Sequence, residues 1–536
     1  MAHQNPAVPT VPDRTQPEMP PTRWGDPAAA APLPDAIRET VGLLLPVRDT
    51  PAATDVATPA TRLADDDLAA LARIVGDGHV TVADDVRRLR TRGKSTPDLL
   101  RQRSGDLADA PDAVVRPGSH EEVVALLAHA EEARIAIVPF GGGTSVTGGL
   151  VAAREGTHGV VSLDLGRLRR LLAVDPVSST ATLEPGLRGP EAEALLAEHG
   201  LMLGHYPQSF EYASIGGFAA TRSSGQSSAG YGRFDEMVVG LRVATPRGDV
   251  RLGTAPADAA GPDLRELFLG SEGAFGVITE VTVRVRPLPE QKSYEGWQWP
   301  SFAAGAEAMR TLAQSDLLPT VLRLSDESET AINLARPDAI GGDGAGGCLM
   351  IVGHEGAPEA VAAKQAAVAR VLEAAGGTPL GHEPGESWAE GRFAAPYLRD
   401  ALLDVNVLVE TLETVTFWSG VDTLYAEVKQ ALTGALGDDA VVLCHISHVY
   451  ATGCSLYFTV VTGGGEDPLA RWLPAKSAAC EAIVACGASI THHHAVGTDH
   501  KPWLTAGIGE VGGTVLRAVK DALDPAGVLN PGVLVP

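Results

Sequence analysis

The stretch Pro139–Leu150 reads P-F-G-G-G-T-S-V-T-G-G-L and follows Ile135–Val138, an apolar run that predicts a short buried strand. Three consecutive glycines allow the backbone to approach a ligand closely. Thr144 and Ser145 add hydroxyls beside free backbone N–H groups, and such concavities suit phosphate oxygens. The stretch is neither a Walker loop nor a Rossmann G-x-G-x-x-G fingerprint. It predicts a phosphate cradle, with a glycine-rich hairpin turn as the alternative.

Two later loops favour the cradle. Tyr206–Gly225 reads Y-P-Q-S-F-E-Y-A-S-I-G-G-F-A-A-T-R-S-S-G, and Leu269–Glu280 reads L-G-S-E-G-A-F-G-V-I-T-E before the alternating strand Val281–Pro287. In this order and at these separations, the three loops resemble the FAD-binding domain of the vanillyl-alcohol oxidase/PCMH flavoprotein superfamily. The resemblance covers about Asp112 to Pro287. It recurs at the C-terminus, where Asp524–Gly532 is similar to the D-P-x-x-[IVL]-x-N-P-G ending of that superfamily.

The resemblance implies an α+β protein, with a PCMH-type two-subdomain FAD-binding domain and an α+β cap domain that binds substrate. The chain has 536 residues, a length that predicts two or more domains. We expect a partly disordered arm over residues 1–60, a helical region over 61–110, the FAD-binding domain over 111–290, the cap over 291–510, and a segment over 511–536 that returns to the FAD-binding domain.

The same resemblance implies an FAD whose pyrophosphate lies in the first loop and whose isoalloxazine ring is held by the second and third. The first loop contributes Pro139, Phe140, Gly141, Gly142, Gly143, Thr144 and Ser145. The second contributes Pro207, Gln208, Ser209, Phe210, Glu211, Tyr212, Ala213, Gly216, Gly217, Thr221, Arg222, Ser223 and Ser224, and the third contributes Glu272, Gly273, Ala274, Phe275, Gly276, Val277 and Ile278. Because no histidine lies in or beside the first loop, we expect FAD to be bound non-covalently.

Composition and net charge limit the kinds of partner that the protein is expected to bind. The net charge of −25 argues against nucleic acid and against electrostatic docking on anionic lipid. No apolar run reaches about 18 residues, so no transmembrane helix is expected. The five cysteines form no C-x-x-C pair, and no signal-peptide pattern is present, so we expect reduced packing thiols and a cytoplasmic location.

Local patterns predict several elements before the first loop. Apolar spacing predicts a helix over 65–75, and Ser119 with Glu122 predicts a capping box after a strand at 113–117. The arginine-rich stretch 85–95 fits either a solvated helix face or a contact for cofactor phosphates, and we favour the solvated face. Trp24, in the arm, is either an anchor onto the folded body or an exposed side chain.

In the second half, Arg323 sits among apolar residues of a strand at 321–324, where its charge needs a partner or a ligand. Arg399 precedes Asp400, and a surface ion pair is the simplest interpretation. Residues 341–347, G-G-D-G-A-G-G, predict a flexible loop, and 358–376 predicts an alanine-rich helix.

Histidines mark the end of the cap. The stretch 445–448 reads H-I-S-H, and 492–494 reads H-H-H. Three consecutive histidines cannot all point one way, so at most two serve one site. We favour an acid–base role; a metal site, which lacks the usual His-x-x-x-His spacing, and a structural role are the alternatives.

Together, these cap patterns resemble the alkyldihydroxyacetonephosphate synthase family, from about Trp24 to Pro531. The resemblance rests on R-W-G at 23–25, G-H-Y-P-Q-S at 204–209, T-P-R-G at 245–248, R-L-S-D at 323–326, Y-L-R-D at 397–400, the stretch 445–458 and H-H-H-x-V-G at 492–497. Carried over, Tyr457 takes the place of the catalytic acid/base, and Arg323 that of the arginine near flavin N5. Arg399 would bind substrate, while His205, His492, His493 and His494 would line the pocket.

The family chemistry implied is the exchange of the acyl group of acyl-dihydroxyacetone phosphate for a fatty alcohol, through an adduct at flavin N5, in ether-lipid synthesis. The partners implied are these small lipid substrates, with room for peripheral membrane contact and for a homodimer. The chain departs from the family in lacking a peroxisomal targeting tripeptide and in reading Phe458-Thr459-Val460 where the family has an aromatic-rich run. The second departure leaves chain-length preference open.

Two alternatives remain at this stage. An FAD-dependent 2-hydroxy-acid dehydrogenase of the D-lactate or glycolate type would use the same scaffold, but such relatives carry G-E-H-G-x-G where this chain has 492–497. A flavin-binding protein without turnover is the other.

Overall fold

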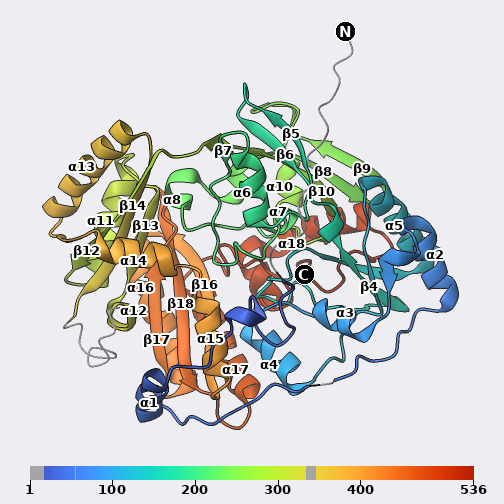
Figure 1. Ribbon diagram of the computed structural model, residues 1–536, viewed down its shortest axis with the longest axis horizontal. Coiled ribbons are helices and arrows are strands. Elements are labelled where there is room, and N and C mark those ends of the chain that lie inside the picture. Colours follow the sequence, from blue (N-terminus) through green and yellow to red (C-terminus); the bar gives the residue numbers. More distant parts are fainter. Residues whose placement is uncertain (1–16, 55, 334–345) are drawn as a thin grey trace.

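The computed structural model describes residues 17–54, 56–333 and 346–536. Figure 1 shows two halves: one built around the strands β12 to β18, and one built around the strands β1 to β11. The first sixteen residues of the expected arm and most of the expected flexible loop at 341–347 lie outside the described residues.

A four-stranded sheet of order β1-β2-β4-β3 carries the first loop. Its strands are β1 (Val80–Thr81), β2 (Ala113–Val115), β4 (Gly159–Asp164) and β3 (Ile135–Phe140). The helix α5 (His120–Ala133) connects β2 to β3, and α2 (Asp65–Val75) packs beside it. Ser119 accepts a bond from the Glu122 N–H, and Glu122 accepts one from Gly118. The capping box therefore forms, although its second hydrogen bond comes from the residue before the N-cap. The strand β3 ends where the triple-glycine loop begins.

A five-stranded antiparallel sheet of order β5-β6-β10-β8-β9 carries the third loop. Its strands are β5 (Leu171–Asp175), β6 (Thr180–Leu183), β10 (Val277–Arg284), β8 (Val238–Thr245) and β9 (Gly248–Leu252). The helices around it are α6 (Gly189–Ala197), α7 (Ile215–Ala220), α8 (Ser228–Tyr231), α9 (Phe234–Met237) and α10 (Arg265–Phe268), and β7 (Leu201–Met202) pairs with β11 (Arg286–Pro287). The second and third loops thus face the first from this sheet.

The other half is a seven-stranded sheet of order β15-β12-β14-β13-β17-β18-β16. Its strands are β15 (Thr378–Gly381), β12 (Gln291–Trp299), β14 (Cys348–Gly356), β13 (Val321–Ser325), β17 (Val441–Ile446), β18 (Gly453–Gly463) and β16 (Val407–Phe417). Buried side chains of α11 (Phe302–Gln314), α13 (Pro358–Ala374), α16 (Val421–Leu436) and α17 (Pro468–Ala485) form one core with it. Cys348, Cys444, Cys454 and Cys480 are buried free thiols, as expected. The remaining helices here are α12 (Glu327–Asn333), α14 (Glu383–Gly391) and α15 (Ala395–Leu403).

The last helix, α18 (Lys501–Leu523), is interrupted at Gly509, whose φ is 72°. It contributes apolar side chains to the core of the five-stranded sheet, and Leu529 forms a parallel bridge with Ile137 of β3. Asn530 donates to the carbonyls of Gly149 and Glu272, which ties the C-terminal turn to the first and third loops.

The arginine-rich stretch is buried, so the favoured solvated face is wrong. It forms α3 (Asp84–Leu89) and the turn into α4 (Thr96–Ser104). Arg90 binds Asp164 through two nitrogens, at 3.1 and 2.9 Å. Arg92 pairs with Asp106 and Asp109. These guanidiniums are compensated by carboxylates from distant segments, which a local pattern does not show.

The described part of the arm is anchored. Trp24 is 4% exposed and its ring meets Tyr212 edge-on at 5.6 Å, while its backbone N–H donates to Asp400. The helix α1 (Asp35–Leu44) follows and lies beside α15 and the beginning of β16. Among the described residues, no helix has both the length and the apolar character needed to cross a bilayer.

Candidate active site

A cavity of about 1330 Å³ lies between the three loops and the seven-stranded sheet. From the loops, its wall includes Pro139, Gly141, Gly142, Gly143, Thr144, Ser145, Pro207, Gln208, Ser209, Ala213, Gly216, Gly217, Thr221, Ser223, Ser224, Glu272, Gly273, Gly276, Val277 and Ile278. Its volume exceeds the ~300–1,000 Å³ of ordinary ligand pockets, so there is room for a large cofactor and a second molecule.

The loops are packed so tightly that glycine is required. A Cβ on Gly142 would lie 2.0 Å from the carbonyl oxygen of Tyr212, and one on Gly141 would lie 2.2 Å from Ser214 Oγ. Gly143 has a φ of 72°, which disfavours a side chain. The main chain of the first loop is therefore bare where it borders the cavity, which fits a dinucleotide pyrophosphate.

Glu272 of the third loop ties the two halves together. Its buried carboxylate accepts the N–H groups of Val496 and Gly497, at 2.9 and 2.9–3.0 Å. Burial raises the pKa of Glu272 to about 7, against the lowering effect of these two bonds. The turn that follows the three histidines is thus held against the third loop.

The opposite wall is one face of the seven-stranded sheet. In register, Glu413 of β16 pairs with Tyr457 of β18, and Tyr457 pairs with His445 of β17. His445 pairs with Ser325 of β13, and Arg323 lies two residues earlier, on the same face. Side chains from four adjacent strands therefore form one polar row facing the loops.

Arg323 finds the partner that its buried position requires. Its Nη2 lies 2.9 Å from Glu329 Oε1 and 3.0 Å from His445 Nδ1, and His445 Nδ1 is 3.0 Å from the same carboxylate. Burial alone would raise the pKa of Glu329, but His445 and Arg323 lower it to about 2. Burial and Arg323 lower the pKa of His445. This end of the row is therefore an ion pair between the Arg323 guanidinium and the Glu329 carboxylate.

Tyr457 lies in the middle of the row. Its ring stacks on His445 at 4.7 Å and meets His494 edge-on at 5.5 Å. Burial raises the pKa of Tyr457 to about 12, so the phenol is protonated at neutral pH. A protonated phenol between imidazoles can donate a proton or pass one on.

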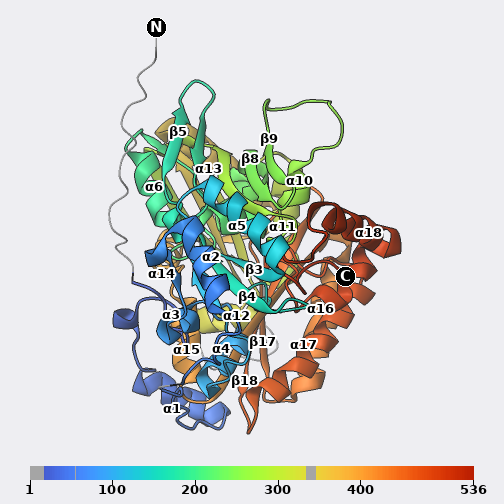
Figure 2. The same cartoon turned by 90° about the vertical axis from the view of Figure 1, so that its right-hand side faces the viewer.

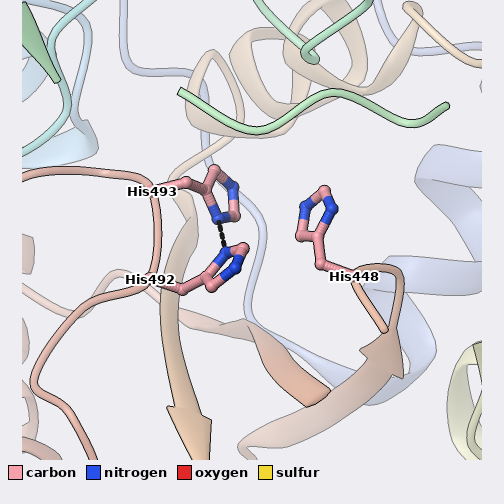
Figure 3. A group of neighbouring side chains, drawn as sticks. All are labelled: His448, His492 and His493. Atoms are coloured by element: carbon pink, nitrogen blue, oxygen red, sulfur yellow. Dashed lines mark hydrogen bonds between the residues drawn. The ribbon is translucent and has the colours of Figure 1, made fainter. Parts of the chain in front are cut away.

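The three consecutive histidines separate, as expected. His493 and His494 border the cavity, whereas His492 accepts or donates a bond of 2.6 Å with Tyr450. Figure 3 shows His492 and His493 joined through their Nδ1 atoms, at 2.9 Å, with the His448 ring beside them. One ring nitrogen from each of these three residues lies within 4.8 Å of the others, an arrangement that could hold a metal ion. His448 Nδ1 faces the hydroxyls of Ser224 and Ser228.

Arg399 borders the cavity near the arm. Its Nη1 donates to the Lys94 carbonyl at 2.7 Å, and its Nε donates to Asp400 at 2.9 Å. The ion pair with Asp400 exists, but Asp400 is buried, so it is not a surface pair. Lys94 is buried and donates to the Pro20 and Pro21 carbonyls, and burial lowers its pKa to about 7. This corner is rich in positive groups.

Other residues assigned to the site lie behind the cavity wall. His205 is 1% exposed, packs between Phe218 and Phe234, and is bonded to Ser223; burial lowers its pKa to about 3. The cavity wall also omits His492, Phe140, Phe210, Glu211, Tyr212, Arg222, Ala274 and Phe275. Several of these are core or packing residues that support the loops.

Sequence reasoning missed Glu413, His445 and Lys94 as site residues. The signal for Glu413 and His445 is their register with Tyr457, which joins strands that are not neighbours in sequence. Lys94 follows the arginine-rich stretch, but only the fold brings it to the cavity.

Comparison with known proteins agrees with this geometry. Residues 111–253 match the family described as "FAD binding domain", and residues 288–534 match "FAD linked oxidases, C-terminal domain". The fold and site therefore define an FAD-dependent enzyme with a FAD-binding domain and a FAD-linked-oxidase cap.

Similar proteins identify the family within this class of FAD-dependent enzymes. The chain is 35% identical to alkyldihydroxyacetonephosphate synthase of Dictyostelium discoideum over 84% of this chain and 77% of that protein. It is 36% identical to the enzyme of the same name from Trypanosoma brucei brucei over 83% and 76%. A solved structure of alkyldihydroxyacetonephosphate synthase superposes with a TM-score of 0.83 at 30% identity, covering 96% of this chain and 99% of that one. The chain belongs to the alkyldihydroxyacetonephosphate synthase family.

Membership in this family confirms the expected α+β fold with an FAD-binding domain and a cap, the FAD cofactor and the enzyme class.

Proposed function

We propose that this enzyme exchanges the acyl group of acyl-dihydroxyacetone phosphate for a long-chain alcohol. The fatty acid leaves as the carbon–oxygen bond to the acyl group breaks, and the alcohol oxygen bonds to the same carbon. The proton of the alcohol balances the charge of the departing carboxylate, so no electrons are gained or lost overall. Bound FAD would supply the covalent handle for the substrate carbon, which the reaction needs between the two steps.

The observation that carries the proposal is the arrangement of the sheet face. The polar row of Arg323, His445 and Tyr457 lies opposite His493 and His494. A neutral histidine beside Tyr457 would take the proton of the substrate carbon, and the phenol of Tyr457 would pass that proton on and return it. Arg323, held by Glu329, would stay charged next to the reacting centre. Both groups are placed by rigid strands rather than by loops, which suits proton transfer.

Arg399 would bind the phosphate of the substrate. Its guanidinium borders the cavity beside Lys94, and a planar guanidinium can donate two parallel bonds to a phosphate. Burial is the main cause of the lowered pKa of Lys94; Asp400 opposes this effect and Arg399 adds to it. A phosphate between Lys94 and Arg399 would favour the charged form of both.

An apolar channel continues from the polar row. On the same face, Thr411, Thr459 and Leu443 follow the row, and Val409, Val461 and Val441 come next, with Val409 and Val461 in register. Leu402 of α15, Val41 of α1 and Leu45, which follows α1, line the far end. A strand-long apolar groove is the wall that a fatty alkyl chain needs.

The open end of this channel would rest on a membrane. Leu44 is 60% exposed and Leu398 45% exposed, and both line the cavity, while Leu43 beside them is 86% exposed. Exposed leucines around the mouth of a lipid channel would let substrates enter from a bilayer without crossing water.

An anaerobic absorbance spectrum tests the proposal. Palmitoyl-dihydroxyacetone phosphate should remove the oxidised flavin band, and hexadecanol should restore it with formation of the alkyl product. Bleaching by D-lactate or glycolate alone, reversed by an electron acceptor, would instead make the protein a 2-hydroxy-acid dehydrogenase.

A further inference from the structure

Glu413 is buried beneath the loop that carries the three histidines, and its side chain is 0% exposed. Its Oε1 accepts bonds from Thr491 Oγ1 at 2.5 Å, from the His493 N–H at 3.2 Å and from the His494 N–H at 3.0 Å. Its Oε2 accepts the His492 N–H at 2.7 Å. One carboxylate therefore holds the backbone of all three histidines.

The same residue is in register with the tyrosine. Glu413 of β16 pairs directly with Tyr457 of β18, so the loop is fixed relative to the phenol by adjacent strands. The rings of His493 and His494 consequently lie 6.2 and 5.5 Å from the Tyr457 ring. At the other end of the loop, Glu272 holds Val496 and Gly497. The loop is thus clamped once from the cap sheet and once from the flavin-binding half.

A fully buried carboxylate is costly unless its lone pairs are satisfied. Burial works to raise the pKa of Glu413, yet the neighbouring histidines, His493 first, lower it well below its ordinary value. The group is therefore an anion, and His493 Nδ1 lies 3.5 Å from Oε2.

We propose that Glu413 is a positioning residue for the proton transfer: it clamps the three histidines against the Tyr457 face and supplies the negative charge beside His493. The clamp stands on the hydrogen bonds alone, whereas its role in turnover rests on the proposed function.

The test compares Glu413→Gln and Glu413→Asp with Asp524→Asn in the FAD-loaded enzyme. Asp524 is the matched control because it is also a buried carboxylate that accepts two backbone N–H groups, but the residues that it holds, Val528 and Leu529, lie outside the cavity wall. The glutamine variant keeps the shape of the side chain but loses the charge and one acceptor. Steady-state exchange gives kcat and KM, and thermal unfolding gives Tm.

Amide hydrogen exchange gives a second readout that needs no turnover, the protection of the His492, His493 and His494 N–H groups. Glu413 accepts all three N–H groups, so the loss of an acceptor in the glutamine variant should speed their exchange.

Glu413→Gln should lower kcat about 100-fold, the usual cost of a misplaced catalytic group, with KM changed less than about 3-fold. It should also speed the exchange of these three amides, and Glu413→Asp should restore part of both. Asp524→Asn should lower Tm but leave kcat and the exchange of these amides unchanged. A wild-type kcat with wild-type amide exchange in Glu413→Gln, or equal changes of both in Asp524→Asn, would overturn the proposal. If the native enzyme forms no alkyl product, the proposed function fails, and the amide exchange still decides the clamp.

Discussion

At the scale of single residues, burial sets the protonation of this site. Tyr457 is protonated, Glu329 is ionised, and burial lowers the pKa of His494 to about 3. Neutral imidazoles beside a neutral phenol form a chain along which a proton can move without creating an unpaired buried charge. This protonation pattern suits the proton transfer that the proposed exchange needs.

Changing Tyr457 to Phe should lower kcat by about 100- to 10,000-fold, the range for loss of an acid–base group, while FAD remains bound. Steady-state product formation and the flavin absorbance of the purified variant measure the two effects. Tyr294→Phe is the control, because that phenol is also buried and bonded to a carboxylate, Glu355, but lies outside the cavity wall. Equal losses in both variants would contradict a catalytic role for Tyr457.

Glu329 should make stability depend on acid. Its pKa falls from 4.5 to about 2 on folding, so its contribution is complete above pH 4.5 and disappears as the pH falls toward 2. That shift corresponds to about 3 kcal/mol. The free energy of unfolding, measured in urea from pH 7 to 2.5, should differ between wild type and Glu329→Gln at pH 7, and the two curves should converge in acid. A difference that stays constant with pH would refute the ion-pair explanation.

The residues that could be predicted from sequence are those that sit in recognisable patterns. Tyr457, Arg323, Arg399, His493 and His494 all reach the cavity wall. Their catalytic and binding roles remain predictions. Glu413 and Lys94 could not be found, because what places them is long-range strand pairing and loop packing rather than local spacing. His205 shows the opposite kind of error. It belongs to a recognisable sequence pattern, but the fold packs it behind the cavity wall.

At the scale of elements, side chains alternate between the two faces of the strands, and the face toward the cavity has a polar part and an apolar part. Every second residue of β16, β17 and β18 faces the cavity, so one face runs from charged to apolar along the strands. The arginine-rich segment at α3 shows how a local pattern can mislead. Its sequence suggests solvent-exposed charges, but the arginines are buried and form ion pairs with Asp106, Asp109 and Asp164.

Val461→Phe should reduce the length of alkyl chain that the channel accepts, because the phenyl ring would fill the groove between Val409 and Val441. The ratio of kcat/KM for hexadecanol to that for octanol should fall at least about 10-fold, while octanol turnover changes little. The short alcohol is the internal control for folding and catalysis. An unchanged ratio would mean that the alkyl chain takes another route.

At the scale of the whole molecule, the active site exists only where the two halves meet. Figure 2 shows the molecule turned by 90°, with α1 at the lower edge and β5 at the upper edge. The three loops and the C-terminal ending were enough to predict the FAD-binding half and the presence of a cap. The seven-strand order of the cap could not be predicted, because β13 and β17 are neighbours in the sheet across more than a hundred residues of chain.

Docking of the whole molecule on lipid should depend on α1. The double change Leu43→Ser and Leu44→Ser should reduce co-sedimentation with neutral phosphatidylcholine vesicles several-fold, because both side chains are exposed at the channel mouth. Val177→Ser is the matched control, since Val177 is 93% exposed at the far edge, in the β5–β6 turn. Vesicle binding that survives the double change would place the lipid contact elsewhere.

The central claim is the exchange of an ester-linked chain for an ether-linked one, and product analysis with ¹⁸O-labelled hexadecanol tests it most directly. With palmitoyl-dihydroxyacetone phosphate as the partner, we predict one free palmitate per alkyl product, with the label retained in the ether oxygen and no electron acceptor consumed. Unlabelled product, or turnover that needs an electron acceptor and a hydroxy acid, would contradict the account.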